Sequence, residues 1–208
     1  MTQKKISFHY QNLEILLHKN VYEPAEDTFL LLDSIDASSK DKMLEIGTGT
    51  GIIALACAQK GAKVICSDIN PFAIELVKKN RELNKNQISG SIEIRKGSLF
   101  EVVKHNETFN LIIFNPPYLT TRQDEQVDNG WFDKAVAGGK TGLDTTIPFL
   151  SKLSEYLTNS GKAFTILSTQ SPREPFNQIL RDHHLKTTII NSLSFTDETI
   201  EVHKITKK

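Results

Sequence analysis

Short apolar runs that suit buried strands alternate along most of the chain with longer segments whose apolar residues recur at helical spacing. The predicted strands of this part are 42–46, 63–68, 91–95, 111–114 and 161–168. The predicted helices are 52–59, 70–83, 144–158 and 172–184. Two further strands are expected within 185–206, meeting near 196–198. This order predicts an α/β fold with an open, mostly parallel sheet that ends in an antiparallel hairpin.

The first 36 residues precede this alternation, and we expect them to form an extension that packs on a core domain of residues 37–208. Residues 6–19 predict two short strands joined by a turn. Pro24 suits the first turn of a following helix, and Glu26 and Asp27 suit the positive end of its dipole. Taken alone, these acids are explained by ordinary helix capping.

Composition narrows the class of protein. The 208 residues include 25 basic and 25 acidic side chains, and the formal net charge is zero. A tight, non-specific nucleic-acid binder would be basic overall, so we expect no stable nucleic-acid binding. The six histidines show no metal-ligand spacing with cysteines or carboxylates, so no metal is expected.

The location of the protein is also suggested by its sequence. Cys57 and Cys66 lie in apolar segments and are expected to be reduced core thiols. No apolar run is long enough to span a bilayer, and no signal-type apolar block follows Met1. We therefore expect a cytoplasmic protein without membrane association.

A glycine-rich turn, residues 47–51, follows the strand at 42–46 and leads into a helix. Glycines such as Gly47 and Gly49 let the backbone approach a ligand closely. The G-x-G-x-G spacing differs from that of dinucleotide sites. Glu45, just before the turn, would repel a pyrophosphate and suits a cationic ligand with an amino group. The pattern resembles the S-adenosylmethionine (SAM) site of class I methyltransferases; a tight turn without a ligand is the minor alternative.

Two further strand ends are candidate cofactor contacts. Asp68 lies 21 residues after Gly47, about the distance at which a ribose-binding acid follows such a loop. A carboxylate there can accept from both ribose hydroxyls, whereas the alternative is a surface acid in a turn. In this fold the end of the third strand meets the adenine, so Ser98 and Leu99 are candidate adenine contacts.

The sequence Asn115-Pro116-Pro117-Tyr118 follows the apolar strand at 111–114, where open α/β sheets place their chemistry. The prolines fix φ and hold Asn115 extended. The Asn115 amide and the Pro116 carbonyl supply acceptors, and Tyr118 supplies a flat ring. Together they could hold both N–H bonds of a planar NH2 group while an electrophile lies on one face. Alone, the motif is equally compatible with a proline-rich turn; the nearby glycine turn favours a site.

A long loop is expected at residues 119–143. Gly139-Lys140-Thr141 superficially matches the end of a phosphate-binding loop, but Lys134 stands where the earlier glycine is required and no strand precedes it. Because loops of this length are usually functional or disordered, its place after the proline turn suggests a wall facing the substrate.

These motifs together resemble a known family. The glycine turn with the Asn-Pro-Pro-Tyr sequence is similar to the amino-group methyltransferases, which act on base amines or glutamine amides. Three stretches resemble the short archaeal and eukaryotic branch of the HemK-type protein-glutamine N5-methyltransferases: Tyr22-Glu23-Pro24-Ala25-Glu26-Asp27-Thr28, Asp68-Ile69-Asn70-Pro71 and Ala137-Gly138-Gly139-x-x-Gly142. The resemblance covers nearly the whole chain from Val21 onward.

The resemblance implies a seven-stranded, Rossmann-like class I fold and methylation of the glutamine in the Gly-Gly-Gln motif of a class 1 translation release factor. It also implies a small zinc-binding activator subunit as partner. The positions that would contact SAM are Thr28, Glu45, Gly47, Gly49, Asp68, Ser98, Leu99 and Asn115. In relatives the position of Ser98 is often Asp.

The same resemblance assigns roles at the proline turn. Asn115 and the Pro116 carbonyl would grip the glutamine amide, Tyr118 would form a wall of the pocket, and Pro117 would complete the substrate-binding turn. Asn115, Pro116 and Tyr118 are therefore the predicted catalytic residues. No strong general base is required, because the sulfonium makes the methyl group electrophilic and the product amide can lose its proton to water.

Three alternatives stay open. The grip on an NH2 group would also suit a nucleic-acid adenine or guanine amino methyltransferase, although the neutral charge counts against it. A protein lysine is a further acceptor. A non-enzymatic scaffold would need neither the glycine turn, nor Asp68, nor the Asn-Pro-Pro-Tyr sequence, and so is disfavoured.

Overall fold

The computed structural model describes residues 6–120 and 130–208. The strands are β1 (Ser7–Tyr10), β2 (Leu13–Leu16), β3 (Lys42–Ile46), β4 (Lys63–Asp68), β5 (Ser91–Lys96), β6 (Phe109–Phe114), β7 (Leu157–Ser168), β8 (Leu185–Ser194) and β9 (Thr199–Lys207). The helices are α1 (Glu26–Ser34), α2 (Ile52–Gln59), α3 (Pro71–Leu83), α4 (Trp131–Val136), α5 (Thr146–Tyr156) and α6 (Arg173–Asp182), with 3₁₀ turns η1 (Lys85–Gln87) and η2 (Leu99–Val102).

Seven strands form the central sheet, in the order β5-β4-β3-β6-β7-β9-β8. The first five of these are parallel, whereas β9 runs antiparallel to both β7 and β8. The predicted fold class, with its C-terminal antiparallel hairpin, is therefore confirmed. The order of the strands reverses between β3 and β6, which pair as far as Ile46 and Phe114. Such a switch point is where open α/β sheets bind their ligands, outside the carboxyl ends of the strands.

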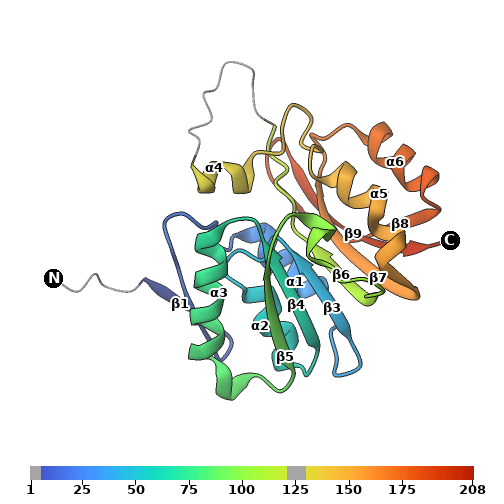
Figure 1. The fold of residues 1–208 in the computed structure, drawn as a ribbon. Coiled ribbons are helices and arrows are strands. Elements are labelled where there is room, and N and C mark those ends of the chain that lie inside the picture. Colours follow the sequence, from blue (N-terminus) through green and yellow to red (C-terminus); the bar gives the residue numbers. More distant parts are fainter. Residues whose placement is uncertain (1–5, 121–129) are drawn as a thin grey trace.

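Helices cover both faces of this sheet (Figure 1). Met43 and Leu111 belong to the core on the side of α1, α2 and α3. Leu44 and Ile112, the next residues of the same strands, belong to the core on the side of α5 and α6. Because successive side chains point to opposite faces and both faces are covered, these strands are continuous apolar runs rather than alternating ones.

The N-terminal strands form a separate two-stranded sheet that packs into the same core. The side-chain oxygens of Asn80 in α3 and of Asn84, which caps α3, accept hydrogen bonds from the backbone N–H groups of Leu16 and Glu14, both at 2.9 Å. These side chains thus supply the hydrogen-bond partners that a neighbouring strand would otherwise give to β2. The hairpin prediction is confirmed, and the domain boundary after residue 36 stays a prediction.

Some predicted elements differ from the structure. Pro24 lies before α1 rather than in its first turn, because the cap is Ala25 and the helix begins at Glu26. The predicted loop at 119–143 contains the helix α4, and its residues 121–129 lie outside the described part. Helix α4 has only six residues and none of them is buried, so it is too short to show a clear helical period in the sequence.

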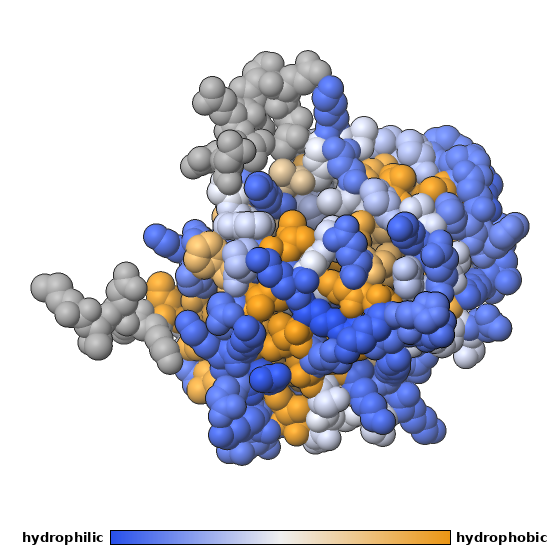
Figure 2. Space-filling model, viewed as in Figure 1, coloured by the Kyte–Doolittle hydropathy of each residue, from blue (hydrophilic) through white to orange (hydrophobic). Residues whose placement is uncertain are grey.

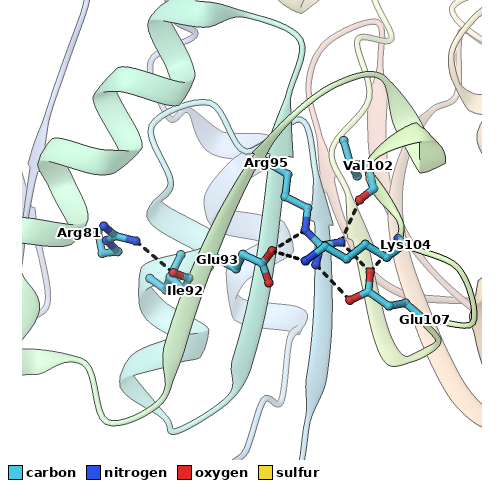
Figure 3. A network of polar contacts seen from close by, with 7 residues as sticks. All are labelled: Arg81, Ile92, Glu93, Arg95, Val102, Lys104 and Glu107. Atoms are coloured by element: carbon cyan, nitrogen blue, oxygen red, sulfur yellow. Dashed lines mark hydrogen bonds and ion pairs between the residues drawn. The ribbon is translucent and has the colours of Figure 1, made fainter.

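Strand β5 is one edge of the sheet, and a network of ion pairs ties it to the segment after it (Figure 3). The Arg95 guanidinium donates to both carboxylate oxygens of Glu107, at 2.6 and 3.0 Å, and to the Val102 carbonyl at 2.8 Å. Glu93 accepts from Arg95 and from Lys104. Because bidentate pairs fix geometry, this network holds the segment 97–107 against the sheet edge.

Polar residues cover most of the face in Figure 2, with hydrophobic residues gathered in its centre. Within residues 6–120 and 130–208, no helix combines the length and apolar character needed to cross a bilayer. Cys57 and Cys66 are free and buried, as predicted.

Candidate active site

A cavity of about 440 Å³ opens where β3, β4 and β6 end, at the switch point of the sheet. Its volume lies in the range of small-molecule sites. The structure brings every predicted site residue into its wall: Thr28, Glu45, Gly47, Gly49, Asp68, Ser98, Leu99, Asn115, Pro116, Pro117 and Tyr118. The individual roles of these residues stay predictions.

The glycine turn needs its glycines because of its backbone conformation. Gly47 has a φ of +66°, Gly49 of +54° and Gly51 of +83°, all in the left-handed region. A Cβ at Gly51 would also lie 3.0 Å from two methyl groups of Val77. The alternation of glycines therefore reflects three left-handed residues in one turn, which brings bare backbone to the cavity.

Glu45 is almost fully buried at the start of this turn. Its Oε2 accepts a hydrogen bond of 2.6 Å from Thr48 Oγ1. Burial raises the pKa of Glu45 to about 8, and the nearby Asp68 adds to the increase, while the hydrogen bond from Thr48 opposes it. At pH 7 the carboxyl is thus mostly protonated, and a cation beside it would favour its ionised form.

Asp68 stands at the end of β4 with both carboxylate oxygens already in use. Oδ2 accepts from Gly49 N at 2.9 Å, and Oδ1 accepts from Asn70 N at 2.8 Å. Burial raises the pKa of Asp68 and these backbone hydrogen bonds oppose the increase. Since a carboxylate can accept about four hydrogen bonds, Asp68 keeps acceptor capacity for a ligand.

Ile69 lines the same cavity, and sequence reasoning did not include it among the site residues. Its side chain is 48% exposed. An apolar residue that stays this exposed, directly after the strand-end acid, can offer an apolar contact to a ligand. Its signal in the sequence is only its position after Asp68.

Ser98 and Leu99 complete the far side of the wall. Ser98 caps η2, and its N–H donates to Glu101 at 3.3 Å. Leu99 has a φ of +45°, an uncommon conformation for a residue with a β-carbon. The ion-pair network around Arg95 holds the segment in which these residues lie.

Asn115 follows β6, and its side-chain amide bonds across the fold to α1. Nδ2 donates to Asp27 Oδ2 at 2.9 Å, although the two residues lie 88 positions apart. Oδ1 is buried and has no hydrogen-bond partner within the described residues. Helix capping alone therefore does not account for Asp27, which also lines the cavity. No local pattern could have joined these two positions.

Tyr118 is partly buried, and burial together with the nearby Asp27 raises its pKa, so the hydroxyl stays neutral. The backbone of this turn is backed by the glycines of residues 137–142. A Cβ at Gly138 would lie 2.8 Å from both the Pro117 carbonyl oxygen and Tyr118 Cα. A Cβ at Gly142 would lie 2.5 Å from the Tyr118 carbonyl oxygen. These glycines let two backbone segments touch and so position the proline turn.

Helix α4 forms the outer wall. Trp131, Lys134, Ala135 and Val136 line the cavity, and the Phe132 ring lies 6.3 Å from that of Tyr22. Part of the segment expected to form a wall thus lines the cavity, and its facing a substrate stays a prediction. Within residues 6–120 and 130–208, no group of three His, Cys, Asp or Glu side chains gathers that could hold a metal.

The fold and the cavity at its switch point define a class I methyltransferase. The chain matches the family model described as methyltransferase small domain over residues 13–192. It belongs to this family and is a SAM-dependent methyltransferase.

Named relatives of this chain agree with that class. Human methyltransferase HEMK2 is 32% identical over 197 residues, which are 90% of each chain. A Methanocaldococcus jannaschii protein is 45% identical over 153 residues, 73% of this chain and 74% of its own, and is provisionally named a protein N5-glutamine methyltransferase. The E. cuniculi Mtq2–Trm112 complex, described as responsible for methylation of the eRF1 termination factor, has a TM-score of 0.67 at 21% identity, covering 91% of this chain and 99% of that one. At this identity it shows the fold alone.

Proposed function

We propose that the protein transfers a methyl group from SAM to the side-chain amide nitrogen of the glutamine in the Gly-Gly-Gln motif of a class 1 translation release factor. The observation that carries the proposal is the unpartnered Oδ1 of Asn115 in the cavity wall. A buried acceptor without a donor is costly unless a ligand supplies one. A primary amide has two N–H donors to offer.

The wall of the cavity suits SAM because it is rich in acceptors. Asp68 keeps acceptor capacity toward the ribose hydroxyls. Glu45 lies before the glycine turn, where it would meet the amino group, and Thr28 contributes a hydroxyl. Ser98, Leu99 and Ile69 would enclose the base. When bound, SAM supplies a methyl group on a positively charged sulfonium, which makes that methyl electrophilic.

Transfer requires that the nitrogen be held rather than deprotonated. Asn115 Oδ1 and the Pro116 carbonyl oxygen would each accept one N–H of the amide, which orients the nitrogen lone pair. Tyr118 and Pro117 would close the pocket around the amide plane. The product loses its extra proton to water, and no side chain needs to act as a strong base.

The partner belongs to the proposal as well. We expect a small zinc-binding activator subunit, because a solved relative of the same fold is a complex of Mtq2 with Trm112. The expectation that this subunit binds zinc rests on the resemblance of the motifs to the HemK-type family. We place the reaction in the cytoplasm, since both buried cysteines are free thiols.

A base amino methyltransferase is the second candidate, because adenine and guanine also present an NH2 group to such a grip. The zero net charge of the chain disfavours this candidate, since phosphate contacts dominate nucleic-acid affinity.

The test is methyl transfer from labelled SAM to three acceptors: a release factor, its variant without the motif glutamine, and total RNA. Each is assayed with and without the activator subunit. Label on the release factor that is lost in the variant supports the proposed substrate, and a requirement for the subunit supports the partner. Label on RNA alone overturns the glutamine assignment.

A further inference from the structure

We propose that Asp27 is the positioning residue that sets the orientation of the Asn115 amide, so that its oxygen rather than its NH2 group faces the substrate. The inference rests on the proposed function, since it concerns the acceptor that grips the substrate nitrogen. It assigns a role in transfer to the segment before β3, which the sequence explains as helix capping.

The geometry leaves one orientation of the amide. An asparagine amide can be turned over without changing its shape, so its partners decide which end faces where. A carboxylate accepts and does not donate, so the end that faces Asp27 Oδ2 at 2.9 Å must be Nδ2. Oδ1 then necessarily lies on the other side, where it is buried without a partner.

Asp27 is itself rigidly held. Its Oδ1 accepts from Thr28 N at 2.6 Å and from the Tyr22 hydroxyl at 3.1 Å. It stands in the first turn of α1, where a negative charge is favoured. Its side chain is only 4% exposed. A buried carboxylate with several donors cannot reorient, so it can impose its preference on Asn115.

A reversed amide would fail chemically. Its NH2 group would meet the N–H bonds of the substrate, and two donors would face one another across the cavity. The nitrogen would lose one of its two acceptors while SAM kept its own contacts. The expected defect is therefore in kcat, with little change in the dissociation constant for SAM.

A pair of exchanged substitutions tests this. In Asp27→Asn, the new amide can keep its oxygen on Thr28 and Tyr22 only by turning its NH2 group toward Asn115, which forces the reversed orientation. We expect kcat to fall on the order of 100-fold, with the SAM dissociation constant within about threefold. In Asp27→Asn/Asn115→Asp, the new carboxylate accepts from that NH2 group and again presents an oxygen to the substrate, so kcat should recover at least tenfold over the single variant.

The matched control is Asp33→Asn, an exposed acid on the same helix, which should leave kcat unchanged. A near-normal kcat in Asp27→Asn overturns the inference, and so does a folded double variant no faster than the single one. A merely structural Asp27 would not be rescued by a change at Asn115.

Asn115→Asp alone provides a second test that does not depend on the folding of Asp27→Asn. It places two carboxyls face to face, and they can stay hydrogen-bonded only while one of them keeps a proton. As pH rises and that proton leaves, repulsion between the two carboxylates displaces the oxygen at position 115. We therefore expect kcat to fall through a new apparent pKa. A pH profile equal to that of the wild type contradicts the inference. Failure of the proposed function is distinguishable, because in that case Asn115→Ala would itself stay active.

Discussion

Thr48 Oγ1 lies 2.6 Å from Glu45 Oε2, and this bond closes the glycine turn onto the strand that precedes it. The bond favours the ionised form of Glu45, against burial and the nearby Asp68, which both raise the pKa of the carboxyl.

Binding of SAM should therefore depend on pH. With a pKa of about 8, Glu45 must lose its proton to meet a cationic amino group. Between pH 6 and about 7.5, where an α-amino group is still charged, the dissociation constant should fall as pH rises, by at most tenfold per unit. Calorimetry across this range measures it. Glu45→Gln should remove the dependence, and a flat wild-type profile contradicts the assigned contact.

Asp68→Ala should weaken SAM binding directly. The substitution removes the acceptors expected for the ribose hydroxyls, and losing hydrogen bonds to a charged group costs about 1.5–3 kcal/mol each, or at least tenfold in affinity. It also removes the partners of the Gly49 and Asn70 N–H groups, so the melting temperature is the necessary control. An unchanged dissociation constant would sink the ribose assignment.

Gly138→Ala should damage the proline turn from behind. Its Cβ would lie 2.8 Å from the Pro117 carbonyl oxygen, so the two backbone segments must move apart. We expect a loss of about 1–3 kcal/mol in the free energy of unfolding, with a fall in kcat. Gly130→Ala is the matched control, because its Cβ would meet nothing closer than 3.7 Å within the described residues. Equal behaviour of the two variants in denaturation and kinetics argues against the positioning role.

Glu107→Gln should loosen the segment that carries Ser98 and Leu99. It breaks the bidentate pair with Arg95, whose side chain is only 10% exposed. A loss of about 2 kcal/mol corresponds to a melting temperature lower by about 4–8 °C, with weaker SAM binding. Glu82→Gln removes an exposed pair with Lys85 and should change the melting temperature little. Similar shifts in both variants would contradict the proposed role of the Arg95–Glu107 pair in holding this segment.

Acid should weaken the Arg95–Glu107 ion pair. The Arg95 guanidinium lowers the pKa of Glu107 to about 2. A carboxyl whose pKa is lower in the folded state stabilises the fold above its unfolded pKa, and this contribution is lost as pH falls toward 2. Comparing wild type with Glu107→Gln by thermal denaturation at pH 7 and pH 3 checks this sign, since the difference should shrink at pH 3.

Much of this fold could be predicted because its strands are buried on both faces. The continuous apolar runs of β3, β4 and β6 have no helical period, and α3 is marked by Asn70 and Pro71 at its start. Residues of the glycine turn and the proline turn converge because both follow neighbouring parallel strands. These signals are local, so they can be recognised in a single sequence.

The rest depends on contacts between distant positions. Asp27 and Asn115 lie 88 residues apart, and the acid run around Asp27 has an adequate local explanation as a helix start. Gly138 is needed because the backbone of Pro117 and Tyr118 packs against it, so the requirement for glycine comes from another segment of the chain. Phe72, an apolar residue in the first turn of α3, is 39% exposed and stacks on His18, which lies far from it in the sequence.

The central claim is that Asn115 grips the nitrogen that receives the methyl group. Asn115→Ala, assayed for transfer to the release factor and for SAM binding in the same preparation, tests it most directly. Transfer should be abolished while much of the SAM affinity is kept, because Glu45, Asp68 and the glycine turn are intact. Near-full transfer activity in that variant would contradict the mechanism.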